Sequence, residues 1–116
     1  VAAEDDLLTQ FLWRSVRGKL LARAGRIDEG ALIAREAVRL AHTSDDPVAQ
    51  GNAVLALAEV HALGGHDADA AASLDAAIAR FDAKGSVASI VEARRRMDQV
   101  SAWRGSSQPR GIGRIG

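Results

Sequence analysis

The sequence predicts an all-α protein built from helical hairpins. Alanine and leucine dominate the 116 residues, aromatic residues make up only 3%, and both prolines lie outside the helical patterns. A turn followed by an amphipathic helix at residues 25–40 returns, 40 residues later, at 65–80. Strong helix formers and an internal repeat of this length favour stacked helices, which we expect to form a short α-solenoid.

The first hairpin is expected at about residues 5–43. Asp5 and Asp6 are candidate N-caps of its first helix. Apolar residues recur in that helix at i, i+4 spacing and form a broad apolar stripe of Leu8, Leu12, Val16, Leu20 and Ala24. Gly25 supplies the turn, and Asp28 is the expected cap of the second helix. Short connections of this kind predict antiparallel neighbours.

The second hairpin is expected at about residues 46–84. Asp46 followed by Pro47 is a strong helix start, because an acidic N-cap precedes a proline at the first helical position. Two glycines end this helix, and Asp67 is the expected cap of the next one.

A final helix is expected at about residues 86–103, with Ser86 as its cap. We expect residues 1–105 to form one domain. The polar, glycine-rich stretch 106–116 offers few groups that could pack and is expected to be disordered.

Small residues stand where two helices must approach closely. We expect Gly18 to face Ala37 in the first hairpin and Ala58 to face Ala77 in the second. A glycine inside a helix costs about 1 kcal/mol relative to alanine, and a close crossing of two backbones offsets that cost. One hairpin cannot bury its own apolar faces, so stacking of the hairpins is expected.

These small residues carry a resemblance to tetratricopeptide repeats. Mid-helix positions match at Gly18 and Ala58, and the turns match at Gly25 and Gly65. The small positions of the second helices match at Gly30, Ala37, Ala70 and Ala77. The resemblance covers about residues 8–84. It departs from the family in its period of 40 instead of 34 and in the arginines of the first helix.

A narrower likeness is carried by TQFLWRSVRGKLLARAGRIDEG, LIAREAVRLAHTSDD and LALAEVHALGG. These strings are similar to the C-terminal repeats of actinobacterial regulators that combine an adenylate/guanylate cyclase-like domain with an ATPase domain. The chain begins with Val1, which indicates a piece of a longer protein. The likeness implies a protein–protein interaction or intramolecular regulatory module of a signalling or transcription-regulatory protein. Any catalytic domain would lie upstream, and this segment itself is not expected to be an enzyme.

The resemblance also implies where a partner binds. By motif position, the first helices of the repeats present a partner-binding groove of Ser15, Lys19, Arg23, Asn52, Leu55 and Glu59. The final helix adds Glu92, Arg95 and Gln99 as weaker candidates.

The first helix has more apolar surface than one neighbour can cover. Its outer face around Leu8, Phe11 and Leu12 is expected to mediate self-association, giving a homo-oligomer, or to bind an upstream helix. The partner is therefore a protein or an upstream domain of the same chain.

Two positive side chains of the first helix, Arg14 and Arg17, stand close to the apolar stripe. They either extend their guanidinium groups to water or pair with Glu36 or with an upstream repeat. The sequence leaves these two interpretations open.

Two alternatives remain for the function. The C-terminal end is basic, with Arg94, Arg95, Arg96, Arg104, Arg110 and Arg114, so a module that contacts nucleic acid is one of them. However, the 15 basic and 15 acidic residues of the whole chain balance, which makes nucleic acid an unlikely partner. The other alternative is a purely structural spacer.

Several site signals are weak. His61 and His66, with Asp67 and Asp69, are metal-ligating residue types, but no complete ligand set is present and no metal is expected. The GIGRIG of residues 111–116 matches a dinucleotide motif without the strand and helix that such a site needs, so no cofactor is expected.

Two compartment signals remain. No apolar run approaches the ~20 residues of a membrane span. The absence of cysteine fits a cytoplasmic location.

Overall fold

The computed structural model describes the backbone of residues 3–107 and the side chains of residues 9–104. This part of the chain is all-helical, as predicted. Its helices are α1 (Ala3–Arg23), α2 (Ile27–Ala41), α3 (Pro47–Leu63), α4 (Asp67–Lys84) and α5 (Val87–Ser107).

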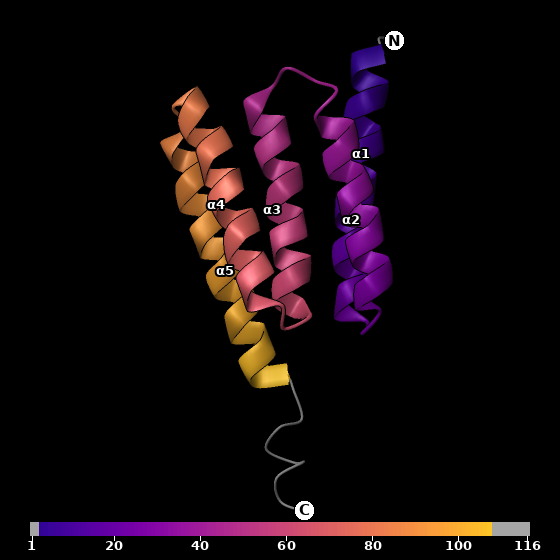
Figure 1. The fold of residues 1–116 in the computed structure, drawn as a ribbon, viewed down its shortest axis with the longest axis vertical. Helices are drawn as coiled ribbons and strands as arrows, with labels where there is room; N and C mark the ends of the chain where they lie inside the picture. Colours follow the sequence, from indigo (N-terminus) through magenta and orange to yellow (C-terminus); the bar gives the residue numbers. More distant parts are fainter. Residues whose placement is uncertain (1–2, 108–116) are drawn as a thin grey trace, which may run out of the picture.

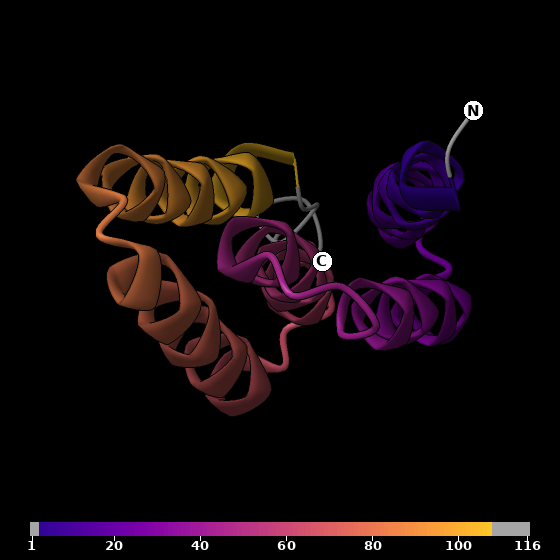
Figure 2. The same cartoon turned by 90° about the horizontal axis from the view of Figure 1, so that it is seen from above.

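The helices run alternately up and down, and α3 lies in the middle (Figure 1). Seen from above, α1 and α5 lie towards one side of α3, and α2 and α4 towards the other (Figure 2). α1 packs on α2, α4 packs on α3, and α1 and α5 both pack on α3. In the described residues neither α1 nor α2 packs against α4 or α5.

The helix boundaries agree with the predicted hairpins at their turns. Gly25, Gly65 and Gly85 all have positive φ, between 74° and 90°, and follow α1, α3 and α4. Glycine adopts this left-handed backbone without the steric penalty of a Cβ. The two glycines 40 residues apart therefore close equivalent turns, as the repeat pattern indicates.

The prediction of an N-cap at Asp46 is confirmed, because its side chain accepts a hydrogen bond from the backbone N–H of Val48 at 3.0 Å. Four other cap predictions are wrong because each helix begins earlier than expected. Asp5, Asp6, Asp28 and Asp67 all lie inside their helices. Acidic residues in a first turn still interact favourably with the helix dipole.

The end of α5 also differs from the prediction. The helix continues through Gly105 to Ser107, so the expected disordered stretch at 106–116 begins too early. A glycine in the last turn of a long helix costs little, since few hydrogen bonds depend on it. Residues 108–116 lie outside the described part of the chain.

Helices α1 and α2 cross with their backbones close together. A Cβ built on Gly18 would lie 2.9 Å from the carbonyl oxygen of Gly30 and 3.3 Å from Cβ of Ala34. The predicted partner, Ala37, is therefore wrong by about one turn. Ala37 instead belongs to a buried cluster with Phe11, Ala41 and two alanines of α3.

Apolar residues of α3 hold the core together. Of its 17 residues, 12 are buried, and seven of these belong to the clusters that connect α3 to α2, α4 and α5. A helix that is apolar on all sides needs neighbours on all sides, which explains its central place.

Candidate protein-binding site

Three helices bring charged groups together on one side of the molecule. Arg96 of α5 donates from Nη2 to Oε1 of Glu59 on α3 at 2.6 Å. The ammonium of Lys19 on α1 lies 3.8 Å from the same oxygen. Glu59 is buried, and the two cations are about three-quarters buried. We refer to Lys19, Glu59 and Arg96 as the charged cluster.

Burial has the largest effect on the pKa of Lys19. Removal from water lowers the pKa of its ammonium, and the nearby positive charges of Arg96 and Arg23 lower it further. The negative charge of Glu59 opposes this effect by raising the same pKa. One turn before Lys19, the buried Oγ of Ser15 has no hydrogen-bond partner in the described structure.

Only some of the predicted groove residues are therefore exposed on the surface. Lys19 and Glu59 meet in the charged cluster, and Arg23 and Asn52 are exposed. Leu55 is wrong as a groove residue, because it is only 1% exposed and packs with Ala77 and Phe81 in the core. Its side chain lies in the interface of α3 with α4 and does not line an exposed groove.

The weaker candidates on α5 are also partly wrong. Arg95 donates to Glu92 on its own helix, at 2.7 and 2.9 Å, instead of reaching towards α3. The side chain that does reach α3 belongs to the next residue, Arg96. Helical spacing does not separate these two arginines, because both lie about one turn after Glu92.

A second surface lies on the outer side of α1. The large apolar side chains of this face are between 45 and 59% exposed: Leu12, Trp13, Val16 and Leu20. Together with Thr9 and Arg17 they line an open hollow of about 530 Å³. We call Leu12, Trp13, Val16 and Leu20 the α1 apolar face. The guanidinium of Arg14 lies 5.0 Å from the ring centre of Trp13, which is a cation–π distance.

The predicted association face of α1 is therefore partly wrong. Leu12 is on the outer face, but Phe11 is 3% exposed and packs inward near Ala37 and Ala41. The side chain of Leu8 lies outside the described residues. The apolar stripe of α1 is exposed at Leu12, Val16 and Leu20.

The two arginines of α1 do not pair with Glu36. That carboxylate is bonded to Arg39 on its own helix. Arg14 donates to the side chain of Gln10 at 2.7 Å, and Arg17 is exposed. The solvent-directed interpretation of these arginines therefore describes them better.

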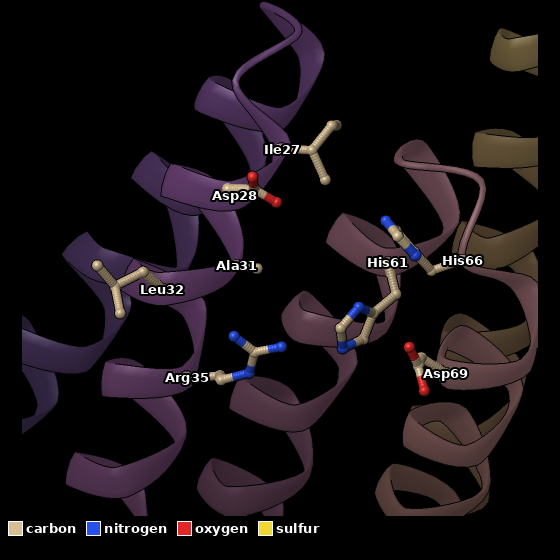
Figure 3. A pocket seen from close by; sticks show the side chains of 8 residues that line it. All are labelled: Ile27, Asp28, Ala31, Leu32, Arg35, His61, His66 and Asp69. Carbon is tan, nitrogen blue, oxygen red and sulfur yellow. The ribbon is translucent and has the colours of Figure 1, made fainter.

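A third feature is a pocket of about 340 Å³ between α2, α3 and α4 (Figure 3). The side chain of Arg35 and the ring of His61 are directed into it, and Asp69 faces them from α4 (Figure 3). Burial lowers the pKa of His61, and Asp69 raises it to a smaller extent. The rings of His61 and His66 meet edge to face, with centroids 6.3 Å apart.

Three further features of the sequence concern metal ligands, a dinucleotide motif and membrane spans. Within the described residues no group of three or more metal-ligating side chains converges. The glycine motif at 111–116 lies outside the described residues. None of the described helices has the length and apolar content needed to cross a bilayer. Comparisons with protein families, with curated proteins and with solved structures find no match to this chain.

Proposed function

We propose that this chain is a protein–protein interaction or intramolecular regulatory module of a larger signalling or transcription-regulatory protein. Its hairpins would stack as a short solenoid of tetratricopeptide-like repeats. The observation that carries the proposal is the α1 apolar face, because four large apolar side chains stand together on one side of one helix.

Such a face is costly in water. Burying a leucine-sized side chain stabilises a protein by about 1.5–3 kcal/mol, and contiguous exposed apolar residues mark interaction surfaces. Charged residues border the face, since Arg14 and Arg17 lie beside it. An apolar centre with a polar rim is the usual anatomy of a protein interface.

The neighbour pattern of the helices supports the stacking. In the described residues, each hairpin packs only on the helices next to it, as expected for repeats arranged in a row. Such a row leaves the first helix with an uncovered side. A purely structural spacer would have no use for a bulky apolar face there.

The nucleic-acid alternative is less well supported. Of the four C-terminal arginines that the structure describes, Arg95, Arg96 and Arg104 form ion pairs with carboxylates. Their charges are therefore largely matched within the protein. We also propose a cytoplasmic location and no catalytic role for this segment.

The proposal is tested by panning a displayed library of amphipathic helical peptides against the chain. The selected peptides should bind the Val16→Asp variant at least tenfold more weakly, because a carboxylate would replace a methyl pair at the centre of the interface. Val91→Asp, at a similarly exposed valine of α5, is the matched control and should bind as the parent does.

Two results would contradict the proposal. One is a failure to select any peptide that distinguishes the parent from Val16→Asp. The other is an affinity for polynucleotides that exceeds the affinity for peptides and falls steeply with salt, as phosphate contacts do.

A further inference from the structure

The internal repeat relates the α1 apolar face to a surface that is already covered inside the molecule. Adding 40 to the residue numbers of Thr9, Trp13, Val16 and Leu20 gives Ala49, Ala53, Ala56 and Val60 of α3. The first four line the open hollow on α1. The four counterparts on α3 are at most 9% exposed, whereas Asn52, the counterpart of Leu12, is exposed.

A single helix supplies much of the cover for the α3 residues. Ala49 and Ala53 share a buried cluster with Ala37 and Ala41 of α2. Val60 shares a second cluster with Ala31 and Ala34 of the same helix. α2 is joined to α3 by a short connection and runs antiparallel to it (Figure 1). The part of the hollow that Thr9, Trp13, Val16 and Leu20 line is therefore the repeat equivalent of the α2–α3 interface.

We propose that the α1 apolar face binds one α-helix, antiparallel to α1, that presents a stripe of alanine-sized residues. This inference rests on the proposed function and names the chemistry of the partner. The bound helix would pack against α1 in the way that α2 packs against α3.

The side chains on α1 explain why the stripe must be small. Trp13 stands where α3 has Ala53, and Leu20 where it has Val60. A bulky side on one helix packs densely only against a small side on the other. Pairing of α1 with α1 of a second copy would bring two bulky stripes together and leave gaps. A helix like α2 is therefore a better fit than a second copy.

The experiment extends the chain by the helix that the repeat demands. A copy of residues 26–46, which comprises α2 and its connection, replaces residues 1–6 directly before Leu7. Leu7 is the repeat equivalent of Pro47, so the added helix enters in register. A Trp103→Phe background leaves Trp13 as the reporter on the face.

The added helix should cover Trp13. We expect its fluorescence emission to shift to shorter wavelength and the melting temperature to rise by more than about 4 °C. Val16→Asp should abolish both effects in the extended chain. In the parent chain the same substitution should change little, because Val16 is 53% exposed.

A second extended chain is the matched control. It carries glutamate in place of the added copies of Ala31 and Ala34, which keeps a helix former but removes the small apolar stripe. Because Ala31 and Ala34 lie in the cluster of Val60, the counterpart of Leu20, this chain should lose the gain in melting temperature and show a smaller emission shift. Equal gains in both extended chains would overturn the proposal, because tethering alone would then explain them.

Two other results also count against this occupant. Unchanged Trp13 emission in the extended chain would show that an α2-like helix does not fit. A concentration-dependent dimer of the parent that Val16→Asp dissociates in sedimentation would show that a second copy occupies the face. If either occurs while peptide binding still depends on Val16, the general proposal stands and only this partner geometry fails.

Discussion

The ring of Phe81 lies against Gly51, at the crossing of α3 and α4. A Cβ built on Gly51 would lie 2.5 Å from Cε1 of the ring, and Phe81 is fully buried. The residues 40 positions earlier, Phe11 and Ala41, share a buried cluster in the first hairpin. The large side chain is thus on the first helix of one hairpin and on the second helix of the other.

This exchange predicts strong coupling between positions 51 and 81. Phe81→Ala should destabilise the fold by about 3–5 kcal/mol through the cavity it leaves. Gly51→Phe alone should also destabilise it, because the ring has no space. The double variant imitates the first hairpin and should recover more than about 1 kcal/mol relative to the sum of the single changes. Chemical denaturation of all four proteins measures this coupling.

A control for this cycle combines Phe81→Ala with a phenylalanine at the exposed residue Ala71 of α4. These changes should add to within about 0.5 kcal/mol. Additive behaviour at 51 and 81 as well would refute the exchange.

Gly30→Ala should destabilise the protein although alanine is the better helix former. The new Cβ would lie 2.5 Å from the carbonyl oxygen of Gly18, which belongs to the backbone and cannot rotate away. We expect a net loss of about 1–3 kcal/mol, against the gain of about 1 kcal/mol from helix propensity alone. A thermal melt above that of the parent would show that the two helices can separate at no cost.

Glu59→Gln should be far more costly than the same change at Glu92. It leaves Lys19 and Arg96 without their counter-charge in a largely buried place, and we expect a loss of about 2–3 kcal/mol. Glu92 pairs with Arg95 in an exposed position, where water screens the pair, so its loss should cost little. Urea denaturation of the two variants compares them, and equal losses would contradict a stabilising charged cluster.

The free energy of unfolding should decrease as the pH is lowered, because of His61. Burial lowers the pKa of its imidazole in the folded state, so the unfolded chain binds a proton more readily. The stabilisation is complete above the unfolded pKa of about 6.5 and is lost as pH falls towards the lower folded pKa. His61→Gln should flatten the dependence of unfolding free energy on pH below about 6.5. An unchanged slope in His61→Gln would assign the effect to other groups.

The sequence predicted the helices and turns well, because these depend on neighbouring residues. Glycines with positive φ and an aspartate before proline act locally. It did not predict which side of α1 is buried, since Phe11 and Leu12 are both apolar and adjacent. The side is decided by the close approach of Gly18 to Gly30, a contact between two helices.

The charged cluster was out of reach for a similar reason. Glu59 and Arg96 are 37 residues apart, and their pairing depends on how α5 packs on α3. Helical spacing places each residue on a face of its own helix, but it does not show which faces meet. The 40-residue offset was the usable long-range signal, and comparing the hairpins through it identifies the uncovered side of α1.

The position of Glu59 has a consequence for communication along the molecule. Helices α1 and α5 do not pack against each other in the described structure, yet Lys19 of one and Arg96 of the other share the same carboxylate oxygen. A shift of Lys19 therefore changes the electrostatic environment of Arg96. Any movement of α1 that displaces Lys19 would therefore be felt at α5 through a single carboxylate of α3.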